Sequence, residues 1–279
     1  MVLDRTRDAR RLAERALVWI LWELRGTDIE PIVLGGLVPE VLADGQEPAV
    51  PAHQGTTDVD LHISVEVDTA SADLAALEPA LERAGFSPSP RNQGGWQWEA
   101  DVEGFSIRVD FLCDSAEVPA QDVIPVTQRL GVMNLRGTGY VLDDFSPRTL
   151  KGALRSGEEV SVEARFAGLA GYVLTKCASA LARQKQKDFY DLAYVVLYNR
   201  SGGPAAALEA ARHPRLAGHV AGMTTKLREI RERFRAPDSP ATRAFVELHE
   251  IASPGGDRAQ LAQDAIAAVS LFTTGLLGD

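Results

Sequence analysis

One short stretch, residues 56–63, constrains the fold most, because it sets two carboxylates two positions apart inside an apolar, β-branched run. Alternate side chains of a strand share one face, so Asp58 and Asp60 would point together while the apolar residues between and after them face a core. Neighbouring like charges repel unless a cation separates them, and Mg²⁺, which prefers oxygen ligands, meets that need. The stretch therefore predicts a strand with a metal site; the alternative is a solvated pair of aspartates at a strand edge.

The composition describes an ordinary globular chain. Its 279 residues suffice for two domains, and no run reaches the roughly 18 apolar residues of a membrane span. The first fifteen residues are dense in Arg and Asp, unlike a secretory signal. Cys113 and Cys177 lie far apart in apolar segments, so we expect buried free thiols in a cytoplasmic protein, no zinc site and no membrane partner.

The charge is divided unevenly along the chain. The net charge of −10 argues against a protein that simply coats nucleic acid. Residues 1–140 hold 11 Lys/Arg against 23 Asp/Glu, whereas residues 148–235 hold 16 against 8. This pattern favours a metal-bearing acidic module beside an anion-binding basic one. The alternative is that the basic surplus is solvated helix surface.

The first half of the chain predicts mixed helices and strands. Two glycines, Gly35 and Gly36, follow an apolar strand and precede a helix, where backbone N–H groups could approach a phosphate, although most such pairs are simply turns. Residues 115–147 are expected to be irregular, apart from a short strand near 140–142. The other expected elements are helices 4–25, 37–43 and 69–85, the last kinked at Pro79, and strands 29–34, 58–63, 96–102, 105–113 and 160–166.

A third carboxylate, Asp110, lies inside the predicted strand 105–113. An aspartate among Val, Phe and Leu is costly to bury alone, so it requires a metal, an arginine or solvent. Arg108 shares its face and could be a purely structural partner. The functional alternative is a third ligand of the metal site.

The second half predicts helices that carry charged residues. Lys176 lies in a helix expected over 169–181, and a Lys/Gln-rich link containing Arg183 and Lys187 follows. Asp188 resembles an N-cap, with Asp191 three residues later as in a capping box. If the helix were unbroken, Asp191 would lie near the face of Lys176, and we expect it to orient Lys176 or Lys187. Three or four helices are expected over 205–277, the last over 261–271.

Taken in order, these motifs resemble the nucleotidyltransferase superfamily with a polymerase-β-like core, and more narrowly its AbiEii-type branch of bacterial toxins. The resemblance rests on the glycine pair, on Thr56 to Leu61 and on the stretch from Lys176 to Leu192. It covers roughly residues 30–195. Two departures are a long insertion before Asp58 and His53-Gln54 where the branch commonly has an arginine.

The resemblance implies a fold, a reaction and a set of site residues. The fold would be α+β, with a nucleotidyltransferase core over residues 1–150, built on a small mixed sheet, and a mostly helical region over 151–279. The reaction would move a nucleoside monophosphate from an NTP to an acceptor and release pyrophosphate. Asp58, Asp60 and Asp110 would hold Mg²⁺, with Mn²⁺ as the alternative. The remaining residues implied in binding or catalysis are Gly35, Gly36, Thr57, Lys176, Arg183, Lys187 and Asp191.

Alternatives remain for the cations and for the acceptor. Lys176 could be a snorkelling surface lysine, and Arg183 and Lys187 part of a solvated run. The acceptor favoured by the resemblance is RNA, such as the 3′ end of tRNA, in a toxin restrained by a cognate antitoxin. A transferase acting on a small molecule of the aminoglycoside type comes second, and a non-catalytic interaction protein with the same fold third.

Overall fold

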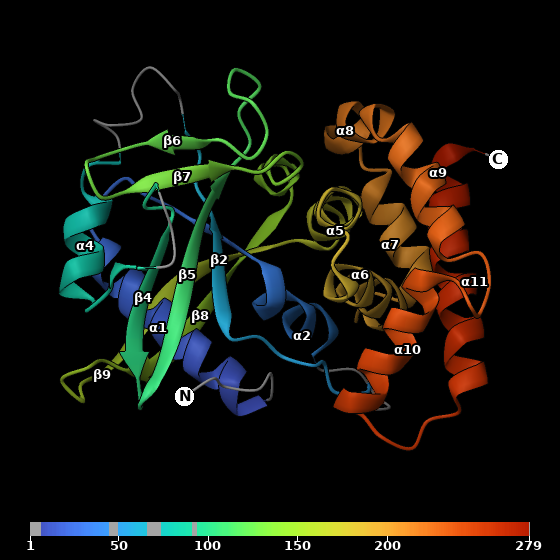
Figure 1. Cartoon of the computed structure of the whole chain (residues 1–279), viewed down its shortest axis with the longest axis horizontal. Coiled ribbons are helices and arrows are strands. Elements are labelled where there is room, and N and C mark those ends of the chain that lie inside the picture. Colours follow the sequence, from blue (N-terminus) through green and yellow to red (C-terminus); the bar gives the residue numbers. More distant parts are fainter. Residues whose placement is uncertain (1–6, 45–49, 66–73, 91–93, 279) are drawn as a thin grey trace. The chain divides into compact units, whose positions relative to one another are not determined.

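The computed structural model describes residues 7–44, 50–65, 74–90 and 94–278, and the chain forms two compact units. The first unit comprises Met1–Leu37, Gly55–Gly139 and Ser146–Ala167. The second comprises Val38–Gln54, Tyr140–Phe145 and Gly168–Asp279. The chain is therefore an α+β protein, with a mixed sheet in the first unit and helices in the second (Figure 1).

The first unit is built on a mixed sheet, which contains nine strands within the described residues. Its main path has the order β3-β4-β5-β2-β1-β9-β8, and β7 joins β6 to β5. The strands are β1 (Ile32–Leu34), β2 (Asp58–His62), β3 (Ser87–Pro88), β4 (Gln97–Val102), β5 (Phe105–Cys113), β6 (Val123–Pro125), β7 (Gly131–Asn134), β8 (Phe145–Ala153) and β9 (Glu159–Ala167).

Helix α1 (Arg7–Leu24) packs against one face of this sheet, where it contacts β2, β4, β5 and β9 (Figure 1). Its apolar residues recur at helical spacing, and Leu17 and Ile20 are fully buried. The alternate residues Val59 and Leu61 of β2 are also fully buried. Because side chains alternate along a strand, Asp58 and Asp60 lie on the opposite face, as the sequence predicts.

Local residue chemistry explains two shorter elements of this unit. Strand β1 begins at Ile32 rather than at residue 29, because Pro31 has no backbone N–H to donate to a ladder. Helix α4 (Leu77–Arg83) is shorter than the helix predicted over 69–85, of which residues 69–73 lie outside the described part. Pro79 sits in its first turn, where a missing N–H is tolerated, so the expected mid-helix position was wrong.

The region between residues 115 and 153 is more ordered than the sequence predicts. The strand expected near 140–142 is instead a 3₁₀ helix, η2 (Gly139–Leu142). Strands β6 and β7 lie in the stretch expected to be irregular. The domain boundary expected at residue 150 falls inside β8, which pairs with β9, and β9 in turn pairs with β1. Because of these long-range hydrogen bonds, the first unit extends along the chain to Ala167.

The second unit is helical and is organised around α6, whose residues 188–196 are all buried. Helices α2, α5, α7, α10 and α11 all contact it. Its helices are α2 (Val38–Ala43), α5 (Leu169–Arg183), α6 (Gln186–Tyr198), α7 (Gly203–Ala211), α8 (Ala217–Gly222), α9 (Thr224–Arg233), α10 (Pro240–Ala252) and α11 (Arg258–Leu277), with the 3₁₀ helices η2 and η3 (Pro214–Leu216). The described residues 203–277 thus contain five α-helices, not three or four, and the last extends beyond 261–271.

None of the described helices combines the length and apolarity needed to cross a bilayer.

Candidate functional site

The three predicted carboxylates lie together on one face of the first unit's sheet. Strands β2 and β5 pair in parallel, with Asp58 opposite Arg108 and Asp60 opposite Asp110. Because all four residues occupy alternate positions of adjacent strands, they share a face. We call Asp58, Asp60, Arg108 and Asp110 the carboxylate face. The register that unites them is set by backbone hydrogen bonds between segments about fifty residues apart.

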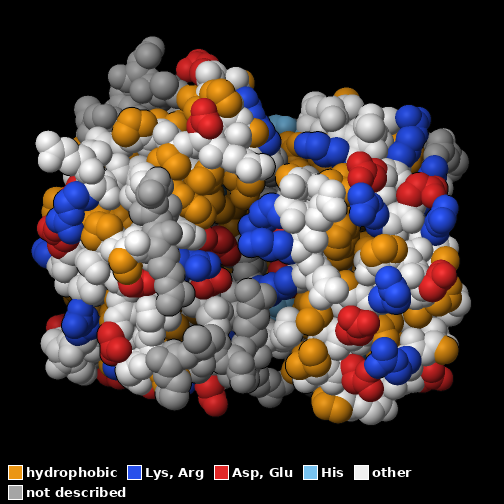
Figure 2. Space-filling view, in the orientation of Figure 1, with side chains coloured by type: hydrophobic (Ala, Val, Ile, Leu, Met, Phe, Trp, Pro, Cys, Tyr) orange, Lys and Arg blue, Asp and Glu red, His pale blue; other side chains and the backbone are white. Residues whose placement is uncertain are grey.

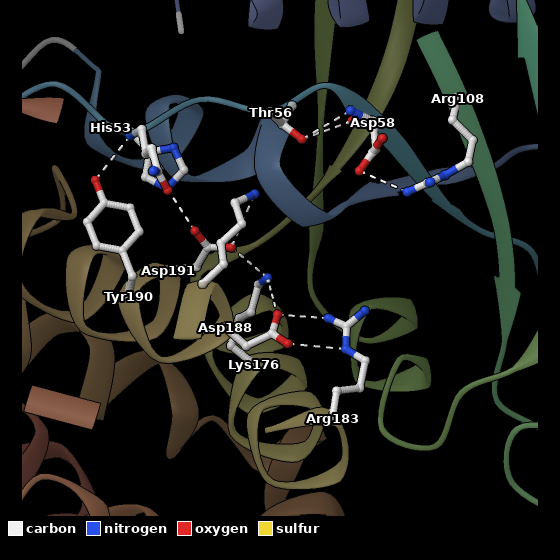
Figure 3. Close-up of polar contacts among 11 residues, drawn as sticks. His53, Thr56, Asp58, Arg108, Lys176, Arg183, Asp188, Tyr190 and Asp191 are labelled. Atoms are coloured by element: carbon white, nitrogen blue, oxygen red, sulfur yellow. Dashed lines mark hydrogen bonds and ion pairs between the residues drawn. The ribbon is translucent and has the colours of Figure 1, made fainter. Parts of the chain in front are cut away.

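Arg108 holds two of these carboxylates. Its Nη2 lies 3.0 Å from Oδ2 of Asp58, a contact drawn in Figure 3. Its Nε donates to Oδ1 of Asp110 at 2.8 Å, and Nε2 of Gln97 donates to the same oxygen at 3.0 Å. The structural partnership between Arg108 and Asp110 that the sequence left open is therefore real. It does not neutralise the face, because one guanidinium stands against three carboxylates.

The ionisation of Asp110 reflects this imbalance. Burial and the neighbouring charge of Asp60 raise the pKa of Asp110 to about 7, against the opposing effect of Arg108. A carboxyl with a pKa near neutrality can exchange a proton under physiological conditions. Asp110 is therefore the residue of this face best suited to take up a proton.

The glycine pair lies directly beside the carboxylates. Gly35 has φ +64°, a left-handed conformation that favours glycine, and a Cβ there would overlap the carboxylate of Asp60. Gly35 and Gly36 form the short 3₁₀ helix η1 (Gly35–Leu37), which contacts β2. Thr57 also adjoins the face, since its hydroxyl lies 3.4 Å from Oδ1 of Asp58. The predicted residues of the first unit are thus brought together.

The carboxylate oxygens of this face are suitable ligands for Mg²⁺, but the side chains are not positioned around a single ion. Carboxylate oxygens are the ligands that Mg²⁺ prefers, and the excess of negative charge favours a divalent cation. Among the residues that the structure describes, however, no three His, Cys, Asp or Glu side chains are arranged to hold one metal ion. Arg108 contacts both Asp58 and Asp110, so a metal bound by those two would require Arg108 to turn away.

The predicted charged residues of the second unit form a group around three buried members, Lys176, Asp188 and Asp191 (Figure 3). We call this group, together with the more exposed Arg183 and Lys187, the ion cluster. Nζ of Lys176 lies 2.7 Å from Oδ2 of Asp191 and 3.1 Å from Oδ1 of Asp188. Arg183 contacts both oxygens of Asp188, at 3.1 and 2.7 Å. Lys176 is therefore not a snorkelling surface lysine.

The cations of the cluster control the ionisation of its acids. Burial alone would raise the pKa of Asp191, but Lys176 and Lys187 outweigh it and hold this pKa well below its ordinary value. Burial would likewise lower the pKa of Lys176, yet Asp191 and Asp188 keep it raised. Lys176 and the carboxylates of Asp188 and Asp191 are thus charged at neutral pH. The cluster has one positive charge in excess, and Arg183 and Lys187 are its more exposed cations.

One interpretation of this region needs correction. Asp188 is not an N-cap: α6 begins after Lys185, and the Asp188 carboxylate binds Lys176 and Arg183. The link predicted after the helix over 169–181 is present: α5 ends at Arg183, and its C-cap Gln184 has a left-handed φ of 51°. Asp191 nevertheless contacts Lys176, as expected, but across two helices rather than along one face.

His53 is a further member of this site, which the sequence did not reveal. Its Nε2 lies 2.9 Å from Oδ1 of Asp191, and both side chains are fully buried (Figure 3). The only signal in the sequence was that His53 stands where the resembling branch commonly has an arginine. Its partner lies 138 residues further along the chain, so no local spacing could reveal the contact.

The charge surplus of residues 148–235 does not form one patch on the face shown in Figure 2. There, Lys and Arg side chains are spread over the second unit and alternate with Asp and Glu. Arg233 and Glu229 of α9 pair at 3.0 Å, and Arg235, which follows α9, lies 3.5 Å from Glu232. For this face the structure favours the solvated helix surface that the sequence left as an alternative.

Comparisons with family models, curated proteins and solved structures found no match for this chain.

Proposed function

We propose that the protein is a nucleotidyltransferase that moves a nucleoside monophosphate from an NTP to an RNA acceptor and releases pyrophosphate. The observation that carries this proposal is the carboxylate face, where the β2–β5 register unites three acids from distant segments beside a glycine pair. Phosphoryl-type transfer depends mainly on positioning and on neutralising negative charge, and a divalent ion does both. The carboxylate oxygens of this face would serve such an ion once Arg108 turned away. The sheet would then correspond to a polymerase-β-like core.

Each residue of this face would have a separate role in the reaction. Asp58 and Asp60 would hold Mg²⁺, or Mn²⁺, which when bound neutralises the charge of the triphosphate. Gly35 and Gly36 leave room for a phosphate to approach the backbone N–H groups. The acceptor hydroxyl oxygen attacks the α-phosphorus, the bond from phosphorus to the α–β bridging oxygen breaks, and pyrophosphate leaves. Asp110, with a pKa of about 7, is suited to accept the hydroxyl proton.

The ion cluster supplies support of a different kind. Lys176 is held in one position by two carboxylates, while Arg183 and Lys187 carry the excess positive charge. A fixed, partly exposed excess of cations suits an anionic ligand, such as a triphosphate or an RNA phosphate. The resemblance to AbiEii-type toxins favours the 3′ end of tRNA as the acceptor and a cognate antitoxin as a partner.

The test is a transfer assay with α-labelled NTPs, Mg²⁺ and total RNA. We expect labelled RNA from the unaltered protein and none from Asp58→Asn or Asp60→Asn. Asp122→Asn, which alters an exposed aspartate of the same unit, should retain full transfer. The circular dichroism spectrum of each variant should be unchanged.

The outcomes separate the competing functions. Label that appears only on an added aminoglycoside would replace RNA with a small cationic acceptor. Undiminished transfer by Asp58→Asn would remove the carboxylate face from the reaction. Absence of transfer with every NTP and acceptor would favour a non-catalytic interaction protein.

A further inference from the structure

His53 is packed against aromatic rings of the second unit. Its ring is stacked on Tyr190, with ring centroids 5.1 Å apart, and meets the ring of Tyr194 edge-on at 4.9 Å. His53 is 2% exposed. The imidazole therefore has little freedom to turn, and its Nε2 is directed at Asp191 (Figure 3).

The same two tyrosines also hold the backbone around His53. The Tyr190 hydroxyl accepts a hydrogen bond from the backbone N–H of Gln54 at 3.1 Å. The Tyr194 hydroxyl donates to the carbonyl of Pro51 at 2.8 Å. Helix α6 thus fixes the chain on both sides of His53, so the position of the ring is set by α6 and not by its own loop.

The protonation of the imidazole follows from its surroundings. Burial lowers the pKa of His53, against the opposing effect of Asp191, so the ring is neutral at physiological pH. Asp191 is ionised and can only accept, so the proton of the neutral ring lies on Nε2 and is donated to Asp191.

This hydrogen bond assigns the two oxygens of Asp191 to different partners. Oδ1 receives His53, and Oδ2 receives Lys176 at 2.7 Å. A carboxylate fixed at both oxygens cannot rotate, so the ammonium of Lys176 has one position. Without the donor, Oδ1 would be buried and unsatisfied, and the group could turn away from Lys176.

We propose that His53 is a positioning residue, whose N–H locks Asp191 and thereby fixes the Lys176 ammonium within a phosphate-binding group of cations in the second unit. This inference rests on the proposed nucleotidyltransferase function. It makes the histidine a part of the site through its N–H rather than through its bulk, and that distinction can be tested.

Two substitutions separate these contributions. His53→Gln keeps a donor at nearly the position of Nε2, whereas His53→Phe keeps the stacking and removes the donor. We expect His53→Phe to lower kcat for transfer by about 10–100-fold, and His53→Gln to restore most of it. His249→Phe is the matched control, because His249 is also buried among aromatic rings of this unit, and it should transfer normally.

Nuclear magnetic resonance supplies a readout that does not depend on activity. In the unaltered protein, ¹⁵N shifts should show a neutral His53 protonated at Nε2, and the Lys176 ammonium should give a resonance that Lys176→Met removes. His53→Phe should shift or broaden that resonance, and His53→Gln should preserve it. If the unaltered protein transfers nothing, the proposed function fails, and these spectra still decide whether His53 positions Lys176.

Three results would overturn the inference. The first is a charged His53 or one protonated at Nδ1, which can be measured without any substitution at residue 53. The second is equal loss of transfer in His53→Gln and His53→Phe, which would assign the effect to packing. The third is a His53→Phe protein with normal kcat and an unchanged Lys176 resonance.

Discussion

Replacing Lys176 by methionine should destabilise the second unit strongly. Methionine fills a similar volume, but it leaves Asp191, whose side chain is fully buried, without its closest cation. Lys187 remains at 3.7 Å from Oδ2, and His53 is neutral. Removing one partner of a buried ion pair costs about 3–5 kcal/mol. Because Asp188 keeps Arg183, we expect a loss near the lower limit, about 3 kcal/mol.

The loss should depend on pH in a defined direction. In the unaltered protein the pKa of Asp191 lies well below its ordinary value, so its stabilising effect is present at pH 7 and disappears only as the pH falls through that low pKa. Without Lys176, burial should raise the pKa of Asp191 above that of the unfolded chain. The variant should therefore regain stability relative to the unaltered protein between pH 7.5 and 5.5.

The sequence offers separate spectroscopic signals for the two units. All four tryptophans lie in the first unit, and all five tyrosines lie in the second. Urea unfolding followed by circular dichroism at 222 nm and by tyrosine absorbance reports on the helical unit, while tryptophan fluorescence reports on the sheet. The destabilisation should appear in the first two signals at lower urea concentration, with the third nearly unchanged.

Two further variants make the reasoning refutable. Lys226→Met alters a half-buried lysine of α9 and should change the free energy of unfolding by less than about 0.5 kcal/mol. Lys176→Met with Asp191→Asn should be more stable than Lys176→Met alone, since no uncompensated charge remains at Asp191. A loss below about 1 kcal/mol for Lys176→Met, with no gain at pH 5.5, would contradict the electrostatic account of the cluster.

Two other predictions concern the carboxylate face. Gly35→Ala should destabilise the first unit by about 2 kcal/mol or more in tryptophan-detected urea unfolding, because φ at this position is positive and the added Cβ would meet Asp60. The control Gly104→Ala also has a positive φ but open space around its Cβ, so it should cost about 1 kcal/mol. Equal losses in the two variants would contradict the predicted contact with Asp60. Asp110→Asn keeps an acceptor for Gln97 and Arg108 but removes the carboxyl group that titrates. Because the pKa of Asp110 is raised to about 7 in the folded protein, this carboxyl stabilises the fold fully at a pH below its pKa in the unfolded chain. That stabilisation is lost as the pH rises through about 7. The variant should therefore gain on the order of 2 kcal/mol over the unaltered protein between pH 5 and pH 8, and a pH-independent difference would show that Asp110 titrates normally.

The sequence by itself determined the local features of this protein. Alternation in residues 58–62 and 105–113 predicted which side chains of β2 and β5 share a face, and Gly104 marked the turn between β4 and β5. Helical spacing predicted α1 and α5 to within a few residues. These properties follow from the periods of strand and helix, which neighbouring residues fix among themselves.

The tertiary structure decided which distant charges meet. The register that sets Asp60 opposite Asp110 depends on hydrogen bonds between separate strands, and Arg108 reaches Asp58 only in that register. The break at Gln184 folds α6 back against α5, so that Asp188 becomes a partner of Lys176 and Arg183 instead of a cap. A buried charge is tolerated only beside its counter-charge, and the chain contains many candidate partners for each. Packing selects one partner among them, and the order of residues along the chain does not specify which.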